Sequence, residues 1–146
     1  MFIGVDEMVN NIMTQMNNIE YGYLDINGII HSNTDELFSE LYKLQSPQET
    51  LKNKTGVCWD QVELERYLFE KDNIEFKTYF IVHYDNDSCP THTFLIYKEN
   101  NKYFWFEHSW KKYRGIKSYD TELEALKDIK EKFISTELNG VYNYMN

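Results

Sequence analysis

The stretch "HTFLIYKENNKYFWFE" (residues 92–107) decides the fold, because it predicts two β-strands joined by a tight turn. Aromatic and β-branched residues, which favour strands, fill residues 92–98 and 102–107. The polar residues between them suit a two-residue loop at Asn100–Asn101. The two strands are therefore expected to form an antiparallel hairpin.

The two-residue loop also fixes the register of this hairpin. It pairs Glu99 with Lys102, so that Phe94 faces Glu107. Side chains alternate in direction along a strand, and His92 therefore shares a face with Glu107 as its diagonal neighbour. The backbones of such neighbours are roughly 7–8 Å apart, a gap that long side chains can bridge. The register predicts an imidazole held by a carboxylate, whereas a slip of one residue would turn Glu107 to the opposite face.

The segments around the hairpin indicate helices first, then a sheet, then a helix. Two further strands are predicted at residues 75–84 and 114–119. Apolar spacing and capping residues predict helices at residues 5–18, 34–45, 47–54 and 57–69, and one that begins after Thr121. This order is typical of an α+β domain with an antiparallel sheet.

The chain has 146 residues, of which 42% are hydrophobic, and this fits a single compact domain over residues 1–146. Within it we expect an N-terminal helical part at about residues 1–55 and a core at about residues 56–134. No repeat, low-complexity tract or linker divides the sequence.

Charge and hydropathy narrow the expected partners and compartment. The formal net charge of −9 would repel polyphosphate, so nucleic acid is not expected as a partner. The N-terminus lacks a basic region and no apolar run is long enough to span a bilayer, so neither a signal peptide nor a membrane partner is expected. We expect a cytoplasmic protein in which Cys58 and Cys89 are free thiols, with signal-independent export left open.

Cys58 lies just after Gly56, where the helix over residues 57–69 is expected to begin. Unpaired N–H groups and the helix dipole at such a position stabilise a thiolate, which is the nucleophilic form of cysteine. Taken alone, Cys58 fits a small buried apolar residue better than a catalytic one, because most cysteines are of that kind. A histidine and a carboxylate on one face of one hairpin supply the base and the orienting group that a nucleophile needs. Cys58, His92 and Glu107 are therefore the candidate catalytic residues.

Three segments in this order resemble the transglutaminase-like branch of the papain-like cysteine enzymes. "GVCWDQ" (56–61) resembles the segment that opens the central helix of that family, and "HTFLIY" (92–97) resembles its histidine strand. "YFWFEHSW" (103–110) resembles the next strand, which usually ends in Asp-Pro-x-Trp. Glu107 then stands in the Asp position and His108 in the Pro position. The match covers about residues 45–112.

The resemblance implies a fold and a mechanism. A central helix that starts at the cysteine would pack on an antiparallel sheet, with N-terminal helices and a C-terminal helix around them. Cys58 would attack a carboxamide, ester or thioester carbonyl, His92 would move the proton, and Glu107 would orient the imidazole. The backbone N–H of Cys58 is the expected oxyanion donor. The second donor stays open, and the upstream side chains that could supply it are those of Gln45, Gln48 and Asn53.

The implied substrate is a peptide, a protein or a small amide, with hydrolysis, deamidation and transfer all open. Trp59 and Trp110 are candidates to line the acyl-binding cleft, although either could equally belong to the core. The chemistry implies no cofactor and no metal. A zinc site is set aside because the available ligands, Cys58, Cys89, His92 and His108, lack paired Cys-x-x-Cys knuckles.

The alternative function is a non-catalytic binding or interaction module on the same fold. An acidic surface, small size and the substitution in the acid motif are compatible with that alternative. The sequence does not predict the oligomeric state.

Overall fold

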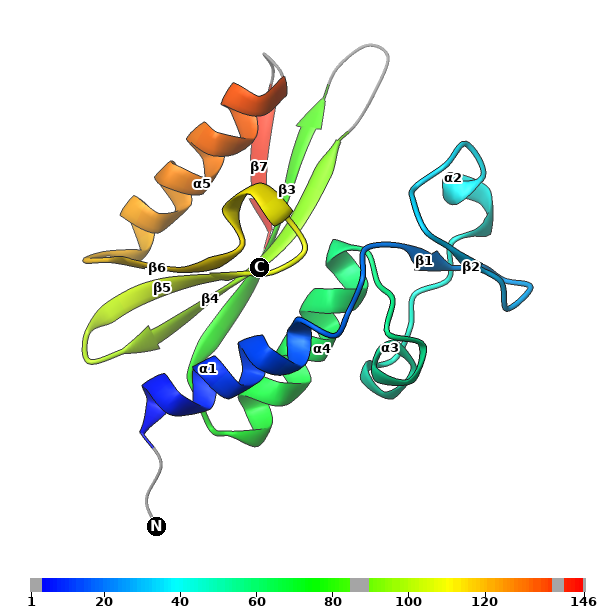
Figure 1. The fold of residues 1–146 in the computed structure, drawn as a ribbon. Coiled ribbons are helices and arrows are strands. Elements are labelled where there is room, and N and C mark those ends of the chain that lie inside the picture. Colours follow the sequence, from blue (N-terminus) through cyan, green and yellow to red (C-terminus); the bar gives the residue numbers. More distant parts are fainter. Residues whose placement is uncertain (1–3, 85–89, 138–140, 146) are drawn as a thin grey trace.

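The computed structural model describes residues 4–84, 90–137 and 141–145 of the chain (Figure 1). The helices are α1 (Val5–Met16), α2 (Phe38–Leu41), α3 (Pro47–Asn53), α4 (Cys58–Lys71) and α5 (Glu122–Glu137), with a short 3₁₀ turn at Lys111–Tyr113. The strands are β1 (Tyr23–Leu24), β2 (Ile30–His31), β3 (Phe76–Tyr84), β4 (Thr91–Glu99), β5 (Lys102–Glu107), β6 (Gly115–Tyr119) and β7 (Val141–Met145). The predicted α+β class is confirmed. No helix within these ranges is long and apolar enough to cross a lipid bilayer.

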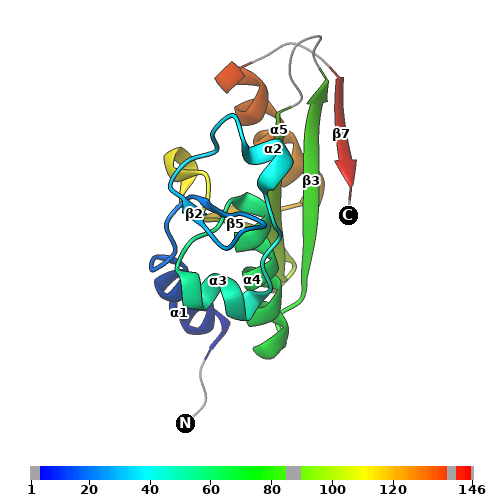
Figure 2. The ribbon, with the colours of Figure 1, turned by 90° about the vertical axis from the view of Figure 1, so that its right-hand side faces the viewer.

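Five strands form one antiparallel sheet in the order β6-β5-β4-β3-β7. The predicted hairpin register is confirmed, because Glu99 pairs with Lys102 along β4 and β5. Asn100 and Asn101 have φ angles of 51° and 63°, the left-handed conformation that a tight hairpin turn requires and asparagine tolerates. Strand β7, which the sequence pattern did not predict, lies beside β3 at one edge of the sheet (Figure 2).

Helices cover both faces of the sheet. Successive residues of β4 point to opposite faces, so they pack against different helices. Leu95 and Tyr97 pack in a buried cluster with residues of α1 and α4. Phe94 and Ile96 pack in a second cluster with Ala125 and Ile129 of α5. The sheet is thus the middle layer of three, with α4 packed directly on its central strand.

The helix predicted at residues 34–45 is wrong, because only Phe38–Leu41 is helical. Tertiary backbone contacts replace the helical ones at the C-terminal end of α2. The N–H of Lys43 donates to the carbonyl of Leu24, and the N–H of Ile26 donates to that of Leu41. These residues instead frame the small β1–β2 hairpin, so the N-terminal part is only partly helical.

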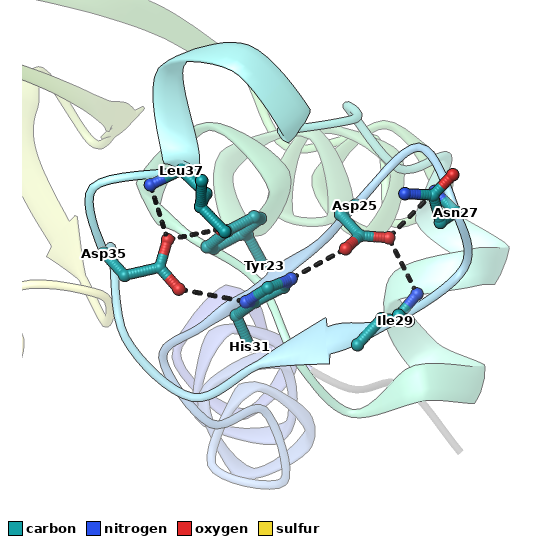
Figure 3. A network of polar contacts seen from close by, with 7 residues as sticks. All are labelled: Tyr23, Asp25, Asn27, Ile29, His31, Asp35 and Leu37. Atoms are coloured by element: carbon teal, nitrogen blue, oxygen red, sulfur yellow. Dashed lines mark hydrogen bonds and ion pairs between the residues drawn. The ribbon is translucent and has the colours of Figure 1, made fainter.

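A polar network holds the β1–β2 hairpin to the loop that follows it (Figure 3). Nε2 of His31 lies 2.7 Å from Asp25, and Nδ1 lies 3.0 Å from Asp35. The ring of His31 stacks on Tyr23, whose hydroxyl donates to Asp35 at 2.6 Å. Both ring nitrogens must carry a proton to donate to two carboxylates, so this geometry belongs to the imidazolium form.

The loop that the network holds carries Thr34, which together with Tyr21 lines a cavity of about 550 Å³. Tyr23 is fully buried and Asp25 is 2% exposed, whereas the side chain of His31 is 18% exposed. The network therefore holds the loop that forms one wall of that cavity. Its charged groups are largely buried, so water screens their interactions only partly.

This network predicts a pH dependence of stability. The hydrogen bond and charge of Asp25, with a smaller contribution from Asp35, raise the pKa of His31 above its ordinary 6.5. A raised pKa means that the stabilisation is complete below pH 6.5 and is lost as the pH rises through the folded-state pKa. We expect the free energy of unfolding to fall over this range, and less so in His31→Gln. Urea denaturation of both proteins from pH 6 to pH 9 measures the difference, and parallel curves would contradict the prediction.

Candidate active site

Cys58 is the first residue of α4, as the sequence predicted. The first N–H groups of a helix have no carbonyl partner within the helix, so the backbone N–H of Cys58 is available to a bound group. Asp60 caps this turn by accepting a hydrogen bond from the N–H of Val57 at 3.1 Å. The side chain of Cys58 is partly exposed, so that its sulfur can be reached from solvent.

Asp60 also ties the start of α4 to the N-terminal part of the chain. Its other oxygen accepts hydrogen bonds from the N–H of Gln45 at 3.0 Å and the hydroxyl of Tyr42 at 2.8 Å. Asp60 is completely buried. Burial raises the pKa of this carboxyl, and the hydrogen bonds oppose that rise because they favour the ionised form. Asp60 thus joins three segments, whereas the sequence pattern indicated only a charge in the first turn of a helix.

The predicted contact between His92 and Glu107 is present. Nε2 of His92 lies 2.6 Å from Oε1 of Glu107, and both residues are buried at the ends of β4 and β5. Three other donors hold the carboxylate: the indole N–H of Trp105, the hydroxyl of Ser109 and the N–H of Trp110. Glu107 therefore fixes the orientation of the imidazole as the hairpin register predicted.

His92 connects Glu107 with Cys58. Burial alone would lower the pKa of His92, but the charge of Glu107 and side-chain hydrogen bonds with Cys58 and Glu107 outweigh it and raise the pKa above the ordinary 6.5. Because Nε2 faces Glu107, Nδ1 is the nitrogen available to the sulfur. His92 is thus hydrogen-bonded to Glu107 and lines the same cleft as Cys58, and the charge of Glu107 favours the imidazolium.

An open cleft of about 550 Å³ contains Cys58 and His92. Its walls are mainly apolar and include three aromatic side chains, those of Tyr21, Trp110 and Phe133. Lys111 lies at the same cleft. A cleft of this size that exposes a thiol beside an imidazole can hold the acyl part of a small or extended substrate.

A family model described as transglutaminase-like domain matches residues 5–135. The chain belongs to this transglutaminase-like family. The resemblance of the three sequence segments is thereby confirmed, and the match extends well beyond the residues that carried it. The chain matches no curated protein.

The two candidate tryptophans of this transglutaminase-like domain lie in different places. Trp110 lines the cleft, and its ring packs edge-on against His92 with the ring centres 5.1 Å apart. Trp59 is 47% exposed, lies nearest to Tyr42 among the rings, and is not among the described residues that line the cleft. The contact of Trp110 limits the orientations of the imidazole, whereas a substrate-binding role of Trp59 stays a prediction.

The upstream side chains that could supply a second oxyanion donor are engaged elsewhere or lie away from the cleft. The amide of Gln45 donates to the carbonyl of Thr55 at 2.7 Å, and its oxygen accepts from Asn53 at 2.8 Å. None of Gln45, Gln48 and Asn53 is among the described residues that line the cleft. The amides of Gln45 and Asn53 instead stabilise the segment that precedes α4.

The ligands of the zinc alternative are only partly covered, because Cys89 lies outside the described residues. Within the described ranges, no group of three or more His, Cys, Asp or Glu side chains is placed to hold a metal ion.

A buried bridge between Gln61 and His108 was missed by the sequence analysis. The amide N–H of Gln61 donates to the carbonyl of Gly56 at 2.8 Å, and its oxygen lies 2.6 Å from Nδ1 of His108. Nδ1 must therefore carry the proton of the imidazole. Burial and the charge of Arg114 lower the pKa of His108 to about 4, so this ring is neutral. The bridge joins the turn before Cys58 to the residue after Glu107.

Glu65 is a second residue that the sequence did not single out. It lies on α4 and is 2% exposed, with one carboxyl oxygen that has no hydrogen-bond partner within the described chain. Burial, with a further contribution from the charge of Glu107, raises its pKa well above the ordinary value. The raised pKa favours the neutral acid form of Glu65, which would avoid repulsion between two buried anions.

The electrostatic roles of the two glutamates can be separated by substitution. Glu107→Gln removes the charge that stabilises the imidazolium, so we expect the pKa of His92 to fall by at least about one unit. Glu65→Gln is the matched control, because it removes no charge from a neutral carboxyl and should leave the pKa of His92 nearly unchanged. NMR titration of the imidazole nitrogens measures both. Equal falls in the two variants would show that Glu65 is ionised and contradict the prediction.

Proposed function

We propose that this transglutaminase-like domain is a thiol-dependent acyl-transfer enzyme that hydrolyses or deamidates a peptide, a protein or a small amide. The observation that carries the proposal is the buried pair of His92 and Glu107, whose imidazole lines one open cleft together with Cys58. A nucleophile, a base and a group that orients the base are the parts that this chemistry needs.

In the first half-reaction, Cys58 becomes acylated. The thiol proton of Cys58 has already passed to Nδ1 of His92, and the thiolate sulfur forms a bond to the carbonyl carbon of the substrate while the π electron pair of the carbonyl moves to its oxygen. When this intermediate collapses, the pair returns, the carbon–nitrogen bond breaks, and the leaving nitrogen takes the proton from His92. The products are a thioester on Cys58 and an amine, or ammonia if the substrate is a primary amide.

In the second half-reaction, His92 takes a proton from water as the water oxygen bonds to the thioester carbon. Collapse of this second intermediate breaks the carbon–sulfur bond, releases the carboxylic acid, and returns the proton from His92 to the sulfur. An amine in place of water would give transfer instead of hydrolysis. These steps draw on no cofactor.

Glu107 acts through the imidazole in both half-reactions. Its carboxylate holds the ring so that Nδ1 faces the sulfur, and its charge stabilises the imidazolium that forms when the thiol gives up its proton. Glutamate has a longer side chain than aspartate, but four hydrogen-bond donors, one of them His92, hold its carboxylate in place. The departure from the aspartate of the family pattern is therefore compatible with the chemistry.

Alkylation by iodoacetamide at pH 6 tests the proposal. An ordinary thiol is almost fully protonated at this pH, whereas a sulfur beside an imidazolium reacts as the thiolate. We expect Cys58 to react at least about tenfold faster than Cys89, after allowing for the lower nucleophilicity of a stabilised thiolate. His92→Ala should abolish this difference. Mass spectrometry of the alkylated peptides assigns each rate to its cysteine.

Two controls complete the assay. Cys89→Ser should keep the fast reaction, and Cys58→Ser should remove it. Equal rates at both thiols of the wild-type protein would favour the alternative, a non-catalytic binding module on the same fold.

A further inference from the structure

The backbone of Tyr21 is attached to the turn that precedes Cys58. The neighbouring Glu20 forms a parallel bridge with Thr55, in which its N–H donates to the carbonyl of Lys54 at 2.9 Å and its carbonyl accepts from Gly56 at 3.0 Å. These bonds place Tyr21 beside the nucleophile although the two residues are far apart in the sequence.

Gly22 permits this close approach on the other side of Tyr21. A Cβ atom at Gly22 would lie 2.4 Å from the carbonyl oxygen of His31, so only glycine fits there without displacing the backbone of β2. The N–H of Gly22 also points to the carbonyl of Gly56 at 3.4 Å. Tyr21 is therefore fixed on both sides, which is a condition for precise placement of a side chain.

The side chain of Tyr21 faces the cleft that contains Cys58 and His92. It is 43% exposed, and its hydroxyl makes no hydrogen bond within the described part of the chain. Burial raises the pKa of Tyr21 to about 12, and the negative charges of Cys58 and Asp60 add to the rise. The hydroxyl therefore keeps its proton at neutral pH, and it lies close enough to the sulfur for the two groups to interact electrostatically.

The chemistry proposed above leaves one role unfilled. An acyl-transfer intermediate carries a negative oxygen that needs more than one hydrogen-bond donor. The backbone N–H of Cys58 supplies one donor, and the upstream amides of Gln45 and Asn53 are occupied by each other and by the backbone. The cleft needs a further donor that keeps its proton and is not engaged elsewhere.

We propose that Tyr21 is that donor, a catalytic residue whose phenolic O–H binds the oxyanion of the tetrahedral intermediate; this inference rests on the proposed acyl-transfer function. As the sulfur of Cys58 bonds to the carbonyl carbon, the π pair moves to oxygen and the hydrogen bond from Tyr21 shortens around the new charge. The phenolic proton stays on Tyr21 throughout. On collapse the electron pair returns to the carbonyl, while the leaving group receives its proton from His92.

Tyr21→Phe tests this role because it keeps the ring in the cleft and removes only the hydroxyl. Tyr67→Phe is the matched control, since Tyr67 lies on α4, is 39% exposed and is not among the described residues of the cleft. The probe is p-nitrophenyl acetate, whose acyl transfer passes through an oxyanion. Iodoacetamide provides the second readout, because its displacement reaction forms no oxyanion and reports only the reactivity of the sulfur.

We expect kcat of Tyr21→Phe for the ester to fall about 10- to 100-fold, with KM changed less than about threefold, because a donor at a partly exposed position is worth less than a fully buried one. The alkylation rate of Cys58 should stay within about twofold of wild type, which also shows that the variant is folded. Tyr67→Phe should match wild type in both reactions.

Three results would overturn the inference. Unchanged ester turnover in Tyr21→Phe would show that the hydroxyl is not used. A parallel loss of alkylation would show that Tyr21 acts on the sulfur and not on the oxyanion. A wild-type protein that p-nitrophenyl acetate does not acylate would overturn the acyl-transfer function itself, and the role of Tyr21 with it.

Discussion

The two-residue turn at Asn100 and Asn101 is the constraint on which the site depends, because it alone sets how far β5 is displaced along β4. With this register, the imidazole of His92 and the carboxylate of Glu107 meet at 2.6 Å in a buried position. Any slip by one residue would exchange the two faces of β5 and place a different side chain beside the histidine. Both asparagines adopt left-handed φ angles, so the local chemistry of the turn supports the long-range contact.

The second half of the site depends on how the N-terminal part of the chain holds the start of α4. Asp60 binds two upstream residues, Tyr42 and Gln45, and caps the turn that carries Cys58. The backbone at Glu20 lies against the same turn from another side. Cys58 is therefore positioned by segments that are distant in sequence. This explains why the N-terminal part, which had no recognisable motif, lies inside the region that the family model matches.

Several ionisable side chains around Cys58 are buried, and burial disfavours their charged forms. Burial raises the pKa of Glu65 and lowers that of His108, so that it favours the uncharged form of each side chain. Glu107 and His92 instead form a charged pair whose members stabilise each other. A buried charge is costly unless it is paired and hydrogen-bonded, and this pair meets both conditions. The positive charge beside the sulfur therefore lies on the imidazole, where it favours a thiolate.

The sequence by itself determined the α+β class, the hairpin register and the start of α4 at Cys58. These features follow from turn residues, caps and alternation, which act over a few positions and can be found in one stretch of chain.

Only the tertiary structure decided the fold of residues 34–45, the placement of Tyr21 beside the nucleophile, and the buried partners Gln61 and His108. Backbone bonds to β1 override the helical pattern of residues 34–45. Tyr21 and Gln61 have no local signal, because a tyrosine before a glycine or a glutamine on a helix looks the same whether it faces solvent or a cleft. Their environments arise from contacts between distant segments, and those contacts exist only once the chain has folded.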